Sequence, residues 1–274
     1  MRASMASFMP SRGLARLTRL RLPNGIWDAA CQIGLWLLAD AGYETVRGLV
    51  AGRSGVALTN ANELVALERS MGSFFEPSLQ AVALHQRWLI DGADFVYVNC
   101  HFLLTTAFVI WVYLFRNSAF YFVRNVFLVS MAACLTVEAV LPLAPPRMLA
   151  GDGFVDTIHS FAHINQDTGT VSALINSYAA MPSMHVAFAS IVGVTGAALA
   201  RRTPLRVLWA LYPLLITGVV IVTANHFWLD AVAGIMASAL AVVMARGPLT
   251  WARPEHWSWR LAPREALAAA SSKS

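Results

Sequence analysis

Long apolar runs divide the chain into segments of membrane-spanning length. Five runs carry few charges, and they lie at about residues 95–115, 120–141, 184–199, 205–223 and 227–245. Each is near the ~20 residues that a helix needs to cross a bilayer. A weaker sixth run, at about residues 26–50, is interrupted by charged residues, namely Asp28, Asp40, Glu44 and Arg47. The pattern predicts an all-α, polytopic membrane bundle with about six transmembrane helices.

A shorter pattern between the first two runs predicts a surface helix. Asn60 and Glu63 have the spacing of a capping box at a helix start. Leu64, Leu67 and Met71 follow at helical spacing, with charged residues between them. We therefore expect an amphipathic helix that begins near Asn60 and lies on the membrane surface.

The composition indicates an integral membrane protein and one domain. Of the 274 residues, 57% are hydrophobic and only 13% are charged, whereas soluble proteins carry roughly 25% charged residues. We expect a membrane-embedded domain over residues 25–247, with a partly disordered cytoplasmic tail at 248–274. Residues 1–24 are rich in arginine and have no acid, as a transit peptide would. A basic cytoplasmic arm before an uncleaved first span is the preferred interpretation.

The arginines predict the orientation of the bundle. Those that follow the basic arm are placed between the apolar runs on the same side as that arm: Arg116, Arg124, Arg201, Arg202, Arg206, Arg246 and Arg253. Positive charge marks the cytoplasmic side, so the loop 142–182 and the turn 224–226 should lie on the outer side of the membrane. We expect this membrane to be a bacterial plasma membrane. Because the net charge of +5 has this explanation, no nucleic-acid partner is expected.

The first candidate motif is Pro182-Ser183-Met184-His185, at the start of an apolar run. Ser183 is a favourable N-cap, and the free N–H groups at a helix start can bind an anion. His185 would then lie in the first turn, beside the anion. The alternative is an ordinary capped helix with an interfacial histidine, which these four residues alone would favour.

The second motif pairs a histidine with a carboxylate. His226 and Asp230 are four positions apart and would share one face of a helix. Asp230 could accept a hydrogen bond from one imidazole nitrogen and leave the other nitrogen as a nucleophile or base. The alternative is a structural pair that ties down the end of the chain.

Arg147 follows a proline-rich segment at 142–146 on the expected external side, where the charge bias requires no arginine. Its guanidinium group suits bidentate phosphate binding. An arginine that extends to the lipid headgroups is an equally good interpretation of this residue alone.

Together, the three motifs resemble those of the type 2 phosphatidic acid phosphatase superfamily. The segments Ala144–Arg147, Tyr178–His185 and Asn225–Asp230 are most similar to the inositol phosphorylceramide synthase branch and its bacterial relatives. The resemblance extends from about Asn60 to about Met244.

The resemblance implies metal-independent phosphoryl transfer without a cofactor. His226, oriented by Asp230, would attack phosphorus and form a phosphohistidine. His185 would protonate the leaving oxygen and then deprotonate water or an alcohol. Arg147 and Ser183, with the amides of the helix start, would hold the phosphate oxygens. These roles suit a reaction that depends mainly on positioning and electrostatics.

Two positions depart from the superfamily pattern. A lysine is usual where this chain has Val140, and an arginine is usual where it has Val220. Arg47 and Arg53 could replace these cations, although a structural role is the preferred interpretation for both. The missing cations leave the substrate open between a phospholipid and a polyprenyl phosphate or diphosphate.

Other classes of function have weaker support. His159 and His163, with Asp152, Asp156 and Asp167 nearby, could form a zinc site, but the sequence lacks the glutamate of His-Glu-x-x-His and the segment suits a short amphipathic helix. A lipid transporter would show inverted repeats or broken helices, and a non-catalytic scaffold would not need both histidines. The acceptor, water or an inositol-like alcohol, stays open because both would use the same residues.

Overall fold

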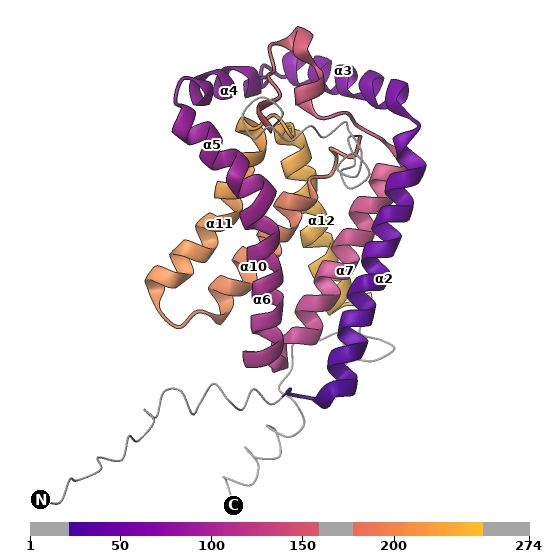
Figure 1. Cartoon of the computed structure of the whole chain (residues 1–274), viewed down its shortest axis with the longest axis vertical. Coiled ribbons are helices and arrows are strands. Elements are labelled where there is room, and N and C mark those ends of the chain that lie inside the picture. Colours follow the sequence, from indigo (N-terminus) through magenta and orange to yellow (C-terminus); the bar gives the residue numbers. More distant parts are fainter. Residues whose placement is uncertain (1–21, 159–177, 249–274) are drawn as a thin grey trace, which may run out of the picture.

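The protein is all-helical and membrane-spanning in character (Figure 1). The structure, a computed structural model, describes residues 22–158 and 178–248. The arm at 1–21, the tail at 249–274 and the His159, His163 and Asp167 of the zinc hypothesis lie outside the described residues.

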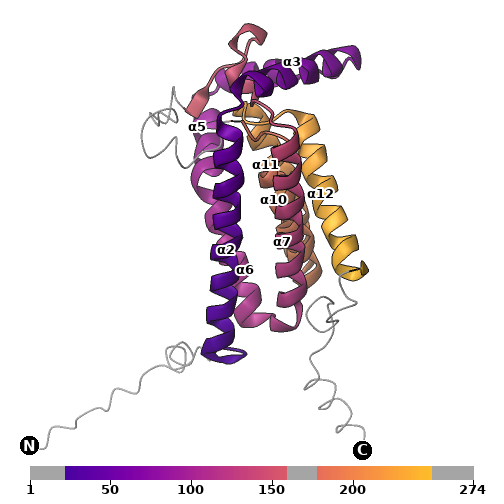
Figure 2. The same ribbon diagram turned by 90° about the vertical axis from the view of Figure 1, so that its right-hand side faces the viewer.

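The predicted bundle is confirmed, and the helix bounds agree closely with the apolar runs. The bundle helices are α2 (Gly25–Ala51), α6 (His101–Phe115), α7 (Asn117–Val140), α10 (Met184–Leu199), α11 (Thr203–Val222) and α12 (Trp228–Arg246). Four helical segments are long and apolar enough to cross a membrane: Arg87–Phe115, Asn117–Val140, Thr203–Val222 and Trp228–Arg246. The α10 helix is apolar but shorter. The charged α2 packs along α7 (Figure 2).

One spanning helix is longer than the sequence predicts. The α5 helix (Arg87–Phe95) continues through one π-helical turn, η1 (Val96–Cys100), into α6. Such turns often occur at functional sites, and this one carries Tyr97 to the edge of a cavity.

Two helices cover one end of the bundle, α3 (Ser54–Ser70) and α4 (Glu76–Leu84) (Figures 1 and 2). The predicted capping box is wrong, because α3 begins at Ser54 and Asn60 and Glu63 lie inside the helix. The side-chain amide of Asn60 instead donates a hydrogen bond to the carbonyl of Pro142 at 2.8 Å. A distant loop, rather than the local helix start, therefore satisfies this polar group.

Small residues allow the bundle helices to approach closely, as is common in membrane proteins. A Cβ atom at Gly193 of α10 would lie 2.7 Å from Pro213 of α11. A Cβ atom at Gly196 of α10 would lie 2.5 Å from the ring of Trp209 of α11. A Cβ at Gly234 of α12 would overlap the carbonyl oxygen of Ser183. At the same contact, the N–H of Ser183 donates to the carbonyl of Asp230 at 2.9 Å.

The two histidine motifs lie at the same end of the bundle. The connections before α10 and between α11 and α12 are at the end covered by α3 and α4, while the α6–α7 and α10–α11 connections are at the opposite end (Figure 1). The opposite end carries Arg116, Arg201 and Arg202. These three arginines and the histidine motifs are therefore separated by the length of the bundle.

The close approach of Gly234 in α12 to the carbonyl oxygen of Ser183 generates a stability prediction. Gly234→Ala should lower the free energy of unfolding by about 1–3 kcal/mol through overpacking, and it should abolish activity by moving α12 away from Ser183. Gly218→Ala is the matched control, because a Cβ at this helical glycine meets nothing within 4 Å. Thermal unfolding in detergent measures the stability of both purified variants. Equal melting temperatures for the two variants would contradict the prediction.

Candidate active site

His226 is held in a tight turn between α11 and α12. The backbone N–H groups of Asn225 and His226 both donate to the carbonyl of Val220, at 3.0 and 3.1 Å. Just before them, Ala224 adopts a left-handed conformation with φ of 52°, which is uncommon for a residue other than glycine. The backbone of this turn is therefore fixed before the helix begins.

The tautomer of His226 is set by a backbone carbonyl. Its Nδ1 lies 2.7 Å from the carbonyl oxygen of Ala180. Because a carbonyl can only accept a hydrogen bond, Nδ1 must carry the proton and donate it. The neutral ring then has its lone pair on Nε2, the nitrogen that would act as a nucleophile or base.

Asp230 acts on this site differently from the sequence expectation. His226 precedes α12 rather than lying on it, and its Nδ1 is 3.6 Å from Oδ2 of Asp230, beyond a normal hydrogen bond. Oδ2 instead accepts from the backbone N–H of Phe227 at 2.9 Å and so caps the helix. Asp230 thus places a buried carboxylate near the imidazole, while Ala180 makes the shorter contact.

His185 lies across from His226 in an aromatic setting. The two ring centroids are 5.8 Å apart. His185 stacks on Tyr97 with centroids 4.5 Å apart, and it lies 5.1 Å from the ring of His101. Among the described residues, none bonds the buried Nε2 of His185. Buried polar atoms are nearly always paired, so this nitrogen is a candidate for contact with a bound group.

Arg147 is brought to the same place by the loop after α7. Its backbone N–H donates to the carbonyl of Ala224 at 2.9 Å, and its guanidinium group donates to the side-chain oxygen of Asn225. A second contact, at 3.8 Å, joins its Nε to Asp156. The structure thus places a buried arginine next to the residue that precedes His226.

Ser183 is an N-cap, as its position predicts. Its hydroxyl oxygen accepts from the backbone N–H of Val186 at 3.4 Å at the start of α10. The side chain is fully buried, and the cavity wall beside it is formed by Met184 and His185. Its contribution is therefore to fix the helix start that presents His185.

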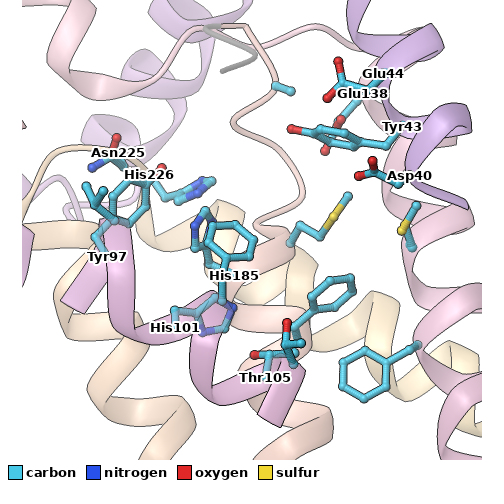
Figure 3. A pocket seen from close by; sticks show the side chains of 18 of the residues that line it. Asp40, Tyr43, Glu44, Tyr97, His101, Thr105, Glu138, His185, Asn225 and His226 are labelled. Carbon is cyan, nitrogen blue, oxygen red and sulfur yellow. The ribbon is translucent and has the colours of Figure 1, made fainter. Parts of the chain in front are cut away.

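These side chains border a cavity of about 780 Å³ (Figure 3). His185, His226, Arg147 and Asn225 line one part of it. Apolar side chains of the bundle form a second part, including Trp36, Phe127 and Phe188, and acidic residues of α2 and α7 form a third. A phosphate group and a lipid chain could therefore occupy one continuous space.

Several residues of the site are not among those that the sequence motifs predict. Tyr97, His101 and Asn225 line the cavity, and His101 is fixed by a 3.0 Å contact between its Nδ1 and the hydroxyl of Tyr212. Asn225 directly precedes His226, so its place in the sequence was enough to predict that it lies at the site. Tyr97 and His101 lie within an apolar run, where only the tertiary structure distinguishes them from core residues.

Two buried glutamates near the start of α12, Glu68 and Glu76, are also absent from the predicted motifs. Glu76 accepts from the backbone N–H groups of Trp228 at 3.1 Å and of Phe75 at 3.0 Å, and so it joins α4 to the start of α12. Glu68 lies in the same fully buried cluster. Burial, reinforced by the negative charge of Glu76 and that of Asp230, raises the pKa of Glu68 to about 9.

The superfamily usually has a lysine and an arginine where this chain has Val140 and Val220, and neither valine lies in the site. Val140 is 75% exposed and Val220 is fully buried, and neither lines the cavity. Arg53 donates to the carbonyl of Ala139 at 2.7 Å, which agrees with a structural role. The side chain of Arg47 lies outside the described residues. Within the described cavity wall, Arg147 is the only arginine or lysine.

The described part of the chain offers no group of three histidine, cysteine or acidic residues that could hold a metal ion. Asp152 pairs with Arg69 at 2.6 Å, and Asp156 lies near Arg147. The histidines of the zinc hypothesis are outside the described residues.

Comparison with known proteins identifies the class. The family model described as the PAP2 superfamily matches residues 62–244. The chain therefore belongs to the PAP2 superfamily, whose members are phosphoesterases, and it is a membrane phosphoesterase of the phosphatase or phosphotransferase type. No curated protein and no solved structure matches the chain.

The Glu68 site generates a pH prediction. The unfolded chain loses this proton near pH 4.5, whereas the folded protein keeps it to about pH 9. The stabilising effect of the proton is complete below pH 4.5 and is lost progressively as the pH rises to about 9. Glu68→Gln, which keeps a neutral side chain, should therefore flatten the fall in melting temperature between pH 5 and pH 9. Glu63→Gln, an exposed change on the same helix, should not. Parallel melting curves for the wild type and Glu68→Gln would contradict this prediction.

Proposed function

We propose that the protein transfers a lipid-linked phosphoryl group through a phosphohistidine on Nε2 of His226. The observation that carries this proposal is the bond from Nδ1 of His226 to the Ala180 carbonyl, at 2.7 Å. It holds the proton on Nδ1 and leaves the Nε2 lone pair for attack on phosphorus. Asp230, 3.6 Å from Nδ1, would favour the positive charge that the ring gains when Nε2 binds phosphorus.

In the first step, His226 bonds to phosphorus while the bond from phosphorus to the leaving oxygen breaks. His185 donates a proton to that oxygen, which leaves as an alcohol. In the second step, His185 takes the proton from water or an acceptor alcohol, whose oxygen displaces His226. The unpartnered Nε2 of His185 and the 5.8 Å between the ring centroids support this role, because they place a possible proton donor close to the proposed nucleophile.

Arg147 is the proposed partner of the phosphate oxygens. Its guanidinium group is already oriented by Asn225 and is almost fully buried, so its charge is poorly screened and strongly felt by an anion. The amides at the start of α10, held in place by the Ser183 cap, add donors on the side of His185.

We further propose transfer of an inositol-phosphate-type group to or from a lipid as the favoured branch. The similarity of the segments around Arg147, His185 and His226 to inositol phosphorylceramide synthases supports it, as does a cavity with both apolar and polar walls. A polyprenyl phosphate or diphosphate phosphatase is the second candidate, and a non-catalytic lipid transporter or scaffold is the third. The arginines in the short connections at the opposite end of the bundle, Arg116, Arg201 and Arg202, support a site that faces the outside of the membrane.

The nucleophile can be tested directly. With ³²P-labelled lipid phosphates, the wild type should form an acid-labile, alkali-stable phosphoenzyme, and His226→Ala should form none and lose at least about 10³-fold in turnover. His85→Ala is the control, because His85 is an exposed histidine outside the cavity. Unchanged turnover of every lipid phosphate by His226→Ala would rule out the proposed chemistry.

Metal independence has a separate test. Because the proposed steps use only protein side chains, treatment with EDTA followed by gel filtration should leave turnover unchanged, and added Mg²⁺ or Zn²⁺ should not raise it. Activity that is lost with the chelator and restored by one of these ions would reverse this part of the proposal.

The acceptor can be identified by measuring release of inorganic phosphate in detergent with and without candidate alcohols. A transferase should release less phosphate and form a new phosphodiester when its alcohol is present. Equal phosphate release under both conditions would favour the phosphatase.

A further inference from the structure

The cavity has an acidic wall that the proposed chemistry does not use. Asp40, Tyr43 and Glu44 lie on one face of α2, and Glu138 lies near the end of α7 (Figure 3). Figure 3 shows these four side chains gathered on the opposite side of the cavity from His185 and His226. We call them the acidic wall.

Glu138 is the member of the acidic wall that most requires a ligand. Its side chain is 2% exposed, and its Oε2 has no hydrogen-bond partner among the described residues. Buried polar atoms are nearly always paired, and leaving one unpaired destabilises the protein. Since Glu138 borders the cavity, a bound group in that space can supply the missing partner.

The chemistry of the wall restricts what this group can be. An ionised carboxylate accepts hydrogen bonds and a protonated carboxyl group can also donate one, so the best ligand presents groups that can both donate and accept. An anion, such as the second phosphate of a diphosphate, would be repelled in a confined space of low dielectric constant. A single bound cation is also a poor match, because the described acids do not converge as a metal site requires. A ring or chain with several hydroxyl groups can meet acceptors that are spread over two helices.

We propose that the acidic wall is a headgroup subsite that binds the hydroxyl groups of an uncharged polyol. This inference rests on the proposed function, because it assigns the polyol to the group that stays on, or accepts, the phosphate held at His226. The same chemistry could belong to the headgroup of the donor lipid or to a free acceptor alcohol. On this basis, the subsite selects polyol phosphodiesters over diphosphates and simple phosphomonoesters.

The test combines binding with selectivity. Free myo-inositol and phosphatidylinositol are the polyol probes, ethanolamine is the cationic probe and phosphatidic acid is the anionic one. Binding to the full chain in detergent is measured by tryptophan fluorescence and thermal shift. Glu138→Gln keeps the size of the side chain but replaces its carboxyl group with an amide, and it should weaken polyol binding about tenfold. The ratio of kcat/KM for phosphatidylinositol to that for phosphatidic acid should fall by a similar factor.

Two further variants serve as controls. Glu63→Gln removes an exposed charge outside the cavity and should behave as the wild type. Asp40→Asn changes an exposed member of the wall and should weaken polyol binding even if Glu138→Gln does not fold. A response to myo-inositol identifies the acceptor alcohol as the source of the polyol, and a response to phosphatidylinositol alone identifies the donor headgroup.

Several outcomes would overturn the subsite. They are absence of polyol binding by the wild type, tighter binding of ethanolamine than of the polyols, and an equal loss of polyol and phosphatidic acid binding in Glu138→Gln. Because binding needs no turnover, the two proposals fail separately. A protein that binds polyols but forms no phosphoenzyme contradicts only the proposed function. One that forms the phosphoenzyme but binds no polyol contradicts only the subsite.

Discussion

The bond between Nδ1 of His226 and the carbonyl of Ala180 is the contact on which the site depends. It joins the segment before α10 to the turn before α12, which lie 46 residues apart in the chain. Two backbone bonds reinforce this junction, from Ser183 to the Asp230 carbonyl and from Arg147 to the Ala224 carbonyl. These bonds hold the three segments that carry Arg147, His185 and His226 in fixed positions relative to one another.

Acidic groups behind the site support the same junction. Asp230 caps α12 through the N–H of Phe227, and Glu76 accepts from the N–H of Trp228. Buried carboxylates are costly unless hydrogen-bonded, and the free N–H groups of a helix start are suitable partners. The raised pKa of Glu68, about 9, relieves the remaining repulsion by keeping one of these acids neutral. The site therefore combines a rigid backbone with a carboxyl cluster that does not carry its full negative charge.

The cavity places these groups where a lipid can reach them. One wall consists of apolar side chains of the membrane-spanning helices, and the other walls carry cationic and acidic groups at one end of the bundle. Polar and ionisable groups at membrane depth are expensive. Their collection around a single space is therefore best explained by a substrate with an apolar chain and a polar head.

Part of this arrangement could be predicted from the sequence. The helix bounds follow from apolar run length, because a helix in a bilayer must satisfy its own backbone. The Ser183 cap and the nearness of Arg147, His185 and His226 follow from motifs that sit at the same end of successive spans. The errors arose where a distant partner decided the outcome. Asn60 bonds to Pro142 instead of capping a helix, and Ala180 instead of Asp230 makes the short contact with His226.

The sequence by itself determined the class of protein and the residues at the start of the site, because hydrophobicity and helix capping act over neighbouring positions. The tertiary structure alone decided which nitrogen of His226 carries the proton, that Glu68 and Glu76 are buried together, and that Glu138 faces the same cavity as the histidines. These features depend on contacts between segments far apart in the chain, and periodicity carries no information about such contacts.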